Sequence, residues 1–136
     1  MQKKVRVIID TNLWISFLIG KHSSKLKEII YSNRNVLVYS HELLTEFLEA
    51  TRRAKFRRYF TFDESEKLIE IVSKYGDFAE VTTKVEVCRD DKDNFLLALA
   101  TDGKADFLLT GDKDLLTLKS YKETTITTIS AFLEDK

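Results

Sequence analysis

Residues 5–10 read VRVIID, a short run rich in valine and isoleucine that ends directly at an aspartate. Such a run is typical of a strand that is buried on both faces. Similar runs lie at residues 36–39 (VLVY) and 107–110 (FLLT). Each run is followed by sequence with helical spacing, so strands and helices are expected to alternate along the chain.

Alternating strands and helices imply parallel strand pairing, because a parallel connection needs a crossover, which is usually a helix. The predicted fold class is therefore α/β, a Rossmann-like three-layer α/β/α sandwich with a central, mostly parallel sheet. Ser40 is the expected N-cap of one helix, and Gly103 is expected to end another. Helices are predicted at residues 13–19, 22–33, 41–54, 63–75, 94–100 and 112–118, further strands at 77–83 and 125–129, and a last turn near 130–134.

Length and composition indicate a soluble globular protein. The chain has 136 residues, of which 43% are apolar and 32% are charged, so residues 1–136 are expected to form a single domain. The single cysteine, Cys88, cannot form an intrachain disulfide. No stretch approaches the roughly 20 apolar residues that cross a bilayer. We therefore expect a cytoplasmic protein with no membrane partner.

Acidic residues fall where ligands bind in open parallel sheets, at the carboxyl ends of the strands. Each has an ordinary explanation on its own, because aspartate is a favoured N-cap and acids in a first helical turn complement the helix dipole. Capping and the helix dipole do not explain why so many acids come to one edge of the sheet. Asp10 follows the first strand, Asp112 and Asp114 follow the strand at 107–110, and Asp90, Asp91 and Asp93 open the helix at 94–100.

Several carboxylates at one sheet edge require protons or a cation. Two of them about 5 Å apart repel by roughly 3 kcal/mol at an effective dielectric constant of ~20. A ligand set made only of oxygen atoms favours Mg²⁺ or Mn²⁺ over zinc. The sequence therefore points to a site for Mg²⁺ (or Mn²⁺) at this edge.

Three segments carry a resemblance to a known family. They read VIIDTNLWIS at 7–16, ELLTEFLEATRRAKF at 42–56 and CRDDKDNFLLALATDGKADFLLTGDKDLL at 88–116. The chain resembles the PIN-domain family, nucleases that include the toxins of bacterial toxin–antitoxin pairs. The match departs from the family at Asp91, where relatives commonly carry proline.

The resemblance assigns roles to individual residues. It implies that the catalytic and metal-binding acids are Asp10, Glu46, Asp93 and Asp112. Asn12 and Thr110 match polar positions that orient the acids or the attacking water, and Asp114 is an additional acid beside them.

Glu46 depends on the resemblance alone. Glu42, Glu46 and Glu49 share one helix face by their i, i+4, i+7 spacing. Topology would place Glu46 more than a turn from the strand edge, and a plain surface stripe is the alternative reading for all three glutamates.

A basic cluster follows the same helix. The chain as a whole carries 22 basic and 22 acidic residues, so any binding of nucleic acid must be local. The alternatives are an RNA- or partner-binding surface and a solvated helix end whose cations complement the helix dipole. The cluster comprises Arg52, Arg53, Lys55, Arg57 and Arg58.

The expected function is metal-assisted hydrolysis of phosphodiester bonds. The resemblance implies single-stranded RNA as the substrate, a role as the toxin of a toxin–antitoxin pair, a small antitoxin as partner, and homodimers. Haloacid-dehalogenase-like phosphatases are excluded because Asn12 stands where they need a second aspartate. Receiver domains are excluded because their phosphorylation pattern is absent from the sequence. The remaining alternative is a catalytically inactive PIN-like module that binds protein or RNA.

Overall fold

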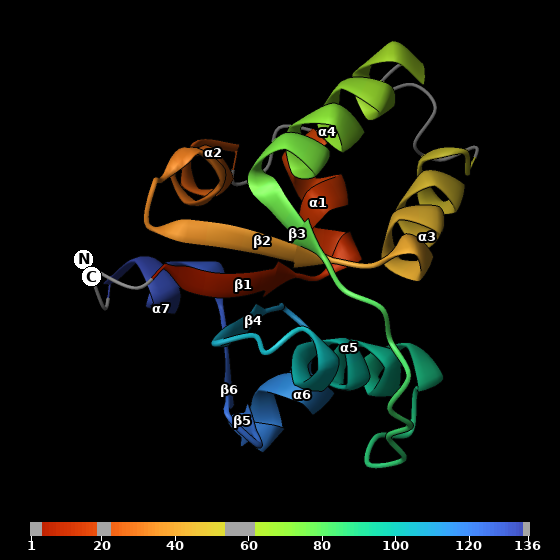
Figure 1. Ribbon diagram of the computed structural model, residues 1–136, viewed down its shortest axis with the longest axis vertical. Helices are drawn as coiled ribbons and strands as arrows, with labels where there is room; N and C mark the ends of the chain where they lie inside the picture. Colours follow the sequence, from red (N-terminus) through yellow and green to blue (C-terminus); the bar gives the residue numbers. More distant parts are fainter. Residues whose placement is uncertain (1–3, 19–22, 54–61, 135–136) are drawn as a thin grey trace.

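The computed structural model describes residues 4–18, 23–53 and 62–134. Within these ranges one sheet has the strand order β3-β2-β1-β4-β6-β5 (Figure 1). Every neighbouring pair is parallel except β5 and β6, which are antiparallel. The strands are β1 (Val5–Ile9), β2 (Asn35–Tyr39), β3 (Gly76–Phe78), β4 (Phe107–Leu109), β5 (Ser120–Tyr121) and β6 (Thr124–Thr127).

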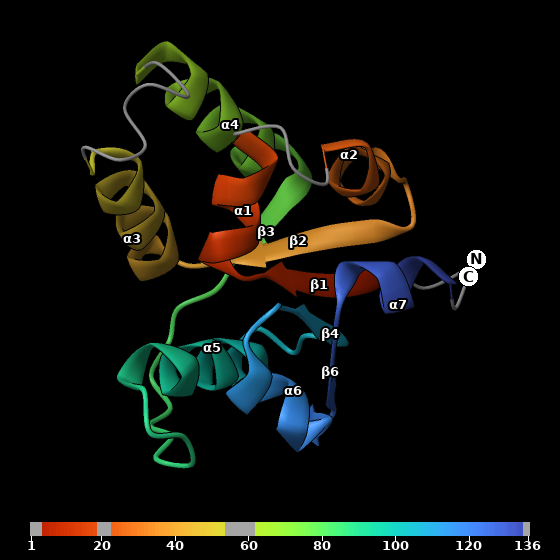
Figure 2. The same cartoon turned by 180° about the vertical axis from the view of Figure 1, so that it is seen from behind.

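Helices cover both faces of this sheet. Four of them, α1 to α4, lie on one side, whereas α5 and α6 lie on the other (Figures 1 and 2). Helix α7 packs beside α2. The predicted α/β sandwich with a mostly parallel central sheet is thus confirmed. The helices are α1 (Thr11–Leu18), α2 (Ser23–Tyr31), α3 (His41–Thr51), α4 (Phe62–Tyr75), α5 (Asp91–Asp102), α6 (Lys113–Leu118) and α7 (Ile129–Glu134).

Strand β1 lies in the middle of the sheet and is buried on both faces, as its run of valine and isoleucine predicts. Val7 and Ile9 belong to the core cluster shared with α1, α2 and α3, and Ile8 belongs to the cluster shared with α5 and α6. Successive side chains of a strand point to opposite faces. The first strand therefore joins the two halves of the core and fixes Asp10 at its carboxyl end.

Two details of the strands differ from the sequence prediction. The strand expected at 77–83 is only the three-residue β3, and the two-residue β5 was not predicted. Gly103 ends α5 as expected, but its φ of −86° is an ordinary one. Space is the reason for glycine here, because a Cβ atom at Gly103 would lie 2.6 Å from Val38 Cγ1 and 2.9 Å from the Leu99 carbonyl oxygen.

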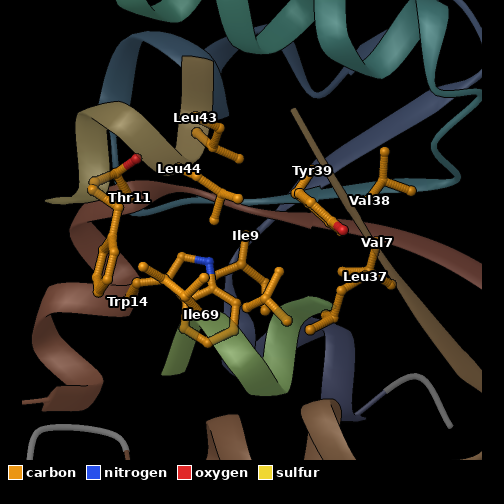
Figure 3. A pocket seen from close by; sticks show the side chains of 12 residues that line it. Val7, Ile9, Thr11, Trp14, Leu37, Val38, Tyr39, Leu43, Leu44 and Ile69 are labelled. Carbon is orange, nitrogen blue, oxygen red and sulfur yellow. The ribbon is translucent and has the colours of Figure 1, made fainter. Parts of the chain in front are cut away.

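An apolar pocket lies between the sheet and the helices α1, α3 and α4 (Figure 3). Trp14, Leu43 and Phe47 contribute to its wall, and all three are buried. Trp14 therefore belongs to the core and is not a surface for stacking bases. Among the described residues no helix is long and apolar enough to cross a membrane.

Candidate active site

The carboxyl ends of β1 and β4 lie between α3 and α5 (Figure 1). A second, polar pocket is lined by residues from these elements. The four acids selected from the sequence, Asp10, Glu46, Asp93 and Asp112, all line it. The structure therefore brings together residues that are up to 102 positions apart in the chain (112 minus 10). The other lining residues are Thr11, Asn12, Ala50, Arg53, Asp90, Lys92 and Leu96.

Asp10 is held by the pairing of β1 with β4. The register pairs Ile9 with Leu109, so Asp10 and Thr110 come next on adjacent strands. The Thr110 hydroxyl donates to Asp10 Oδ2 at 2.7 Å, and the backbone N–H of Asn12 donates to Asp10 Oδ1 at 3.2 Å. Both carboxylate oxygens of this buried aspartate are therefore satisfied within the protein.

Thr110 also connects Asp10 to the next acid. Its hydroxyl oxygen accepts the backbone N–H of Asp112 at 3.0 Å, while Asp112 Oδ1 caps α6 by accepting the N–H of Asp114 at 2.8 Å. Thr110 is 1% exposed, so its hydroxyl is shielded from bulk solvent. The predicted position of Thr110 beside the acids is thus seen, and the contact explains how it orients Asp10. Asn12 lines the pocket but contributes its backbone to this network.

Asp93 is buried without the same support. It lies in the first turn of α5, a helix whose N-cap is Asp90, and it is 5% exposed. Its Oδ2 atom is buried and has no hydrogen-bond partner. A buried charged oxygen without a partner is costly, so this atom is one that a ligand would satisfy.

Three carboxylates lie close enough together to share one ion. Asp93, Asp112 and Asp114 each place one oxygen within 4.8 Å of the others. Asp114 is the exposed member, and Arg89 binds it through an ion pair of 2.9 Å. This group has the oxygen-only chemistry that suits Mg²⁺ or Mn²⁺.

Glu46 reaches the pocket from α3. It is partly buried and lines the pocket, whereas Glu42 and Glu49 are exposed and do not line it. Of the three glutamates on this helix face, therefore, only Glu46 lines the pocket. The order of strands and helices does not predict that Glu46 enters the pocket, because it does not fix the tilt of α3 relative to the sheet edge.

Burial and the negative charge of neighbouring acids raise the pKa values of Asp10, Glu46 and Asp93. Burial is the main cause at Asp10, Glu46 and Asp93. The pKa of Asp93 rises from 3.8 to about 6, with Asp112 as the second cause. The hydrogen bond from Thr110 opposes the rise of the Asp10 pKa, and the positive charge of Lys92 opposes the rise at Glu46. The site thus favours any partner that compensates negative charge.

The predicted basic cluster is only partly visible. Arg52 and Arg53 are exposed at the end of α3, and of these two only Arg53 lines the acidic pocket. Lys55, Arg57 and Arg58 lie outside the described residues, so the proposed binding role of the whole cluster stays a prediction.

Two contributions were missed in the sequence. Lys92 lines the pocket, and its signal was a lysine inside an otherwise acidic first turn. Asn94 anchors the loop before α5: its Oδ1 accepts the N–H groups of Val87 and Cys88 at 3.1 and 2.7 Å, and its Nδ2 donates to the Cys88 carbonyl at 3.0 Å. Its signal was a polar side chain at the start of a helix with a buried, apolar body.

Comparison with known proteins agrees with this geometry. The family model described as the PIN domain matches residues 6–114. The chain is also 31% identical over 121 residues to the uncharacterized protein MJ1680 of Methanocaldococcus jannaschii, a match that covers 85% of this chain and 76% of that protein. The family match includes every acid of the pocket. The chain therefore belongs to the PIN-domain family.

Proposed function

We propose that this chain is a ribonuclease that depends on a divalent metal ion and hydrolyses phosphodiester bonds in single-stranded RNA. PIN domains are generally nucleases and typically bind divalent metals. The acidic pocket offers a site for such an ion, Mg²⁺ or Mn²⁺. The catalytic acids in this proposal are Asp10, Glu46, Asp93 and Asp112.

One observation carries the proposal, namely the unpartnered Oδ2 of Asp93. This oxygen is buried within a protein that satisfies both oxygens of nearby Asp10. Asp93 also belongs to the group whose oxygens lie within 4.8 Å of one another, with Asp112 and Asp114. A set of carboxylates with one orphaned, buried oxygen fits a hard cation better than it fits a purely structural role.

The chain's own residues divide the work. Asp93 and Asp112 would hold the ion, Asp10 would present a preset carboxylate to it, and Glu46 would orient the attacking water from the opposite helix. Thr110 fixes the rotamer of Asp10 through its hydroxyl. A bound Mg²⁺ or Mn²⁺ would supply an activated water and stabilise the charge that develops on the phosphate and the leaving oxygen.

The biological setting is also proposed from the family. We infer that the chain acts as the toxin of a toxin–antitoxin pair, with a small antitoxin protein as partner and a homodimer as its assembly. Expression of the wild-type chain would then arrest growth, and expression of the Asp10→Asn variant would not. Equal growth with both would contradict the toxin role but leave the nuclease activity open to direct assay.

The direct test compares two aspartates from the same helical turn. Asp93 is buried in the pocket, whereas Asp91 is exposed and does not line it. We expect wild-type protein and Asp91→Asn to bind Mn²⁺ in a calorimetric titration and to cleave a single-stranded RNA. Asp93→Asn should lose most of both.

The outcomes separate the nuclease from the inactive module. Mn²⁺ binding without cleavage of any RNA, in a preparation free of contaminating nuclease, would favour a module that has kept the fold and lost the chemistry. Equal losses for Asp91→Asn and Asp93→Asn would show that the pocket is not the metal site.

A further inference from the structure

Two cations line the acidic pocket together with five acids. Arg53 follows the C-terminal end of α3, and Lys92 lies in the first turn of α5. The two cations therefore come from α5 and from the end of α3, helices that lie on either side of the sheet edge (Figure 1). Glu46 lies near enough to both for their charges to act on its carboxylate.

Helix stability does not explain Lys92. A cation in the first turn faces the positive end of the helix dipole, and this end favours acids such as Asp91 and Asp93. Arg53, at the C-terminal end of its helix, has the favourable position. Lys92 is thus the cation that requires an explanation from the pocket itself.

Simple ion pairing does not explain Lys92 either. Ion pairs of 2.8 and 2.9 Å join Arg6 to Asp77 and Arg89 to Asp114, but in the ranges that the structure describes no carboxylate lies within 4.0 Å of the Lys92 or Arg53 cation. Both cations therefore remain available to a negatively charged group that enters the pocket. Such a group would meet cations on its two sides and the acids at the sheet edge.

We propose that Lys92, assisted by Arg53, binds the phosphate backbone of the substrate strand and positions the scissile phosphodiester against the carboxylates. This inference rests on the proposed function. The acids alone repel a phosphate, so a nucleic acid needs cations at the mouth of the same pocket. Lys92 is in this view a positioning residue, and an ammonium group suits the task because it binds phosphate as a point charge.

The competing explanation is that Lys92 only compensates the acids when no ligand is bound. It makes a different prediction. A compensating lysine holds the protein together and competes with metal, so its removal would alter stability and Mn²⁺ affinity without weakening RNA binding. Removal of a phosphate-binding lysine weakens RNA binding. Mn²⁺ affinity would be equal or higher under either explanation, because a cation next to the metal site has been removed, so RNA binding decides between them.

Lys113 provides a matched control. It is the first residue of α6, directly after Asp112, and like Lys92 it is an exposed lysine in a first helical turn. It does not line the pocket. The experiment measures the binding of a labelled single-stranded RNA by fluorescence anisotropy at several KCl concentrations, together with Mn²⁺ titrations and the kcat and KM of cleavage.

We expect Lys92→Gln to weaken RNA binding by about 10-fold and to reduce the slope of log affinity against log salt by about 0.7, the value for one contact to a single-stranded backbone. The KM of cleavage should rise more than kcat falls. Lys92→Arg should restore most of the affinity, Arg53→Gln should have a smaller effect of the same kind, and Lys113→Gln should resemble the wild type.

Equal RNA affinity and salt slope for Lys92→Gln and Lys113→Gln would overturn the inference, as would a loss confined to stability. Wild-type protein that binds RNA in the presence of Mn²⁺ and never cleaves it would contradict the proposed function alone, since the comparison of the two lysines would still be measured on binding. Wild-type protein that binds no RNA would contradict both.

Discussion

Asp10 and Asp93 are two buried aspartates of one pocket, and the protein treats them differently. They are 8% and 5% exposed. Asp10 accepts one hydrogen bond on each carboxylate oxygen, from Asn12 and Thr110, whereas Asp93 has a buried oxygen that accepts none. On the complete side of the pocket, the protein itself satisfies both oxygens of Asp10. On the available side, one oxygen of Asp93 is buried and has no hydrogen-bond partner.

This difference follows from the backbone elements that carry the two residues. Asp10 continues a central strand, where the neighbouring strand delivers Thr110 at the matching register position. Asp93 lies in a first helical turn, where its own backbone N–H is already bonded to the Asp90 carbonyl. A strand edge thus preorganises a carboxylate, while a helix start leaves a carboxylate oxygen available. Preorganisation of one ligand and availability of another is a suitable combination for a reversible metal site.

The largest expected effect is the loss of cleavage in Asp10→Asn. The substitution keeps the side-chain shape but removes a negative ligand, so we expect activity to fall by more than about 1,000-fold, beyond the 10- to 100-fold typical of residues that only orient a ligand. A cleavage assay in Mn²⁺ on nuclease-free protein measures this. Residual activity within tenfold of the wild type would show that the complete side of the pocket is structural.

The next effect is on stability, at Asp93. Its pKa is about 6 in the folded protein against 3.8 ordinarily, so the folded state binds more protons between those values. Stability of the metal-free protein should therefore decrease as pH rises from about 4 to 6 and stay low above it, by up to about 3 kcal/mol for a shift of this size. Asp93→Asn should remove most of this loss.

Thermal unfolding of metal-free protein between pH 4 and pH 8 tests the sign. Asp10→Asn is the comparison, and its gain in stability should be smaller, because an asparagine has one acceptor oxygen and Asp10 uses two. Addition of Mn²⁺ should stabilise the wild type above pH 6, where Asp93 is ionised. A larger gain at Asp10 than at Asp93 would reverse the comparison of the two sides.

The support of Asp10 gives an intermediate effect. Thr110→Val keeps the shape of a buried side chain and removes the hydroxyl that joins Asp10 to the backbone of Asp112. We expect Mn²⁺ affinity to fall by about 10- to 100-fold, as for other residues that orient metal ligands. Thr117→Val is the control, because Thr117 is an exposed threonine of α6 whose hydroxyl donates to the Lys113 carbonyl. Equal affinity for both variants would mean that Asp10 needs no support.

The two sides of the pocket also differ in how well they could be predicted. The runs at 5–9 and 107–110 placed Asp10 and Thr110 at the ends of predicted strands, because a short apolar run rich in β-branched residues indicates a buried strand. That the two strands are neighbours is seen only in the structure. The approach of Glu46 and Lys92 depends on the tilt of α3 and α5, which no local pattern encodes. Likewise β5 was not predicted, because a two-residue strand has too little sequence to show a period.

The sequence also could not predict that a buried oxygen of Asp93 lacks a hydrogen-bond partner. The pattern of three aspartates at a helix start is equally consistent with capping, and Asp90 does cap α5 through the Lys92 N–H at 2.9 Å. Only the packing of the helix shows that Asp91 faces solvent while Asp93 is buried. Sequence thus predicts which acids come to the sheet edge, and packing decides which of them must be neutralised.

The smallest expected effect concerns Arg89, which forms an ion pair with Asp114, the exposed member of the group that includes Asp93 and Asp112. Both side chains are exposed, at 87% and 47%, so their attraction is weak and sensitive to salt. If Asp114 helps to hold the ion, Arg89 competes with the metal for it. Arg89→Gln should then tighten Mn²⁺ binding by about two- to fivefold at low ionic strength. The gain should vanish in about 0.5 M KCl, where surface charges are screened.

Arg34→Gln, an exposed arginine that does not line the pocket, controls for the change in net charge. If Mn²⁺ affinity is the same in all three proteins at low salt, Asp114 is a surface acid, and the available side of the pocket consists of Asp93 and Asp112 without it.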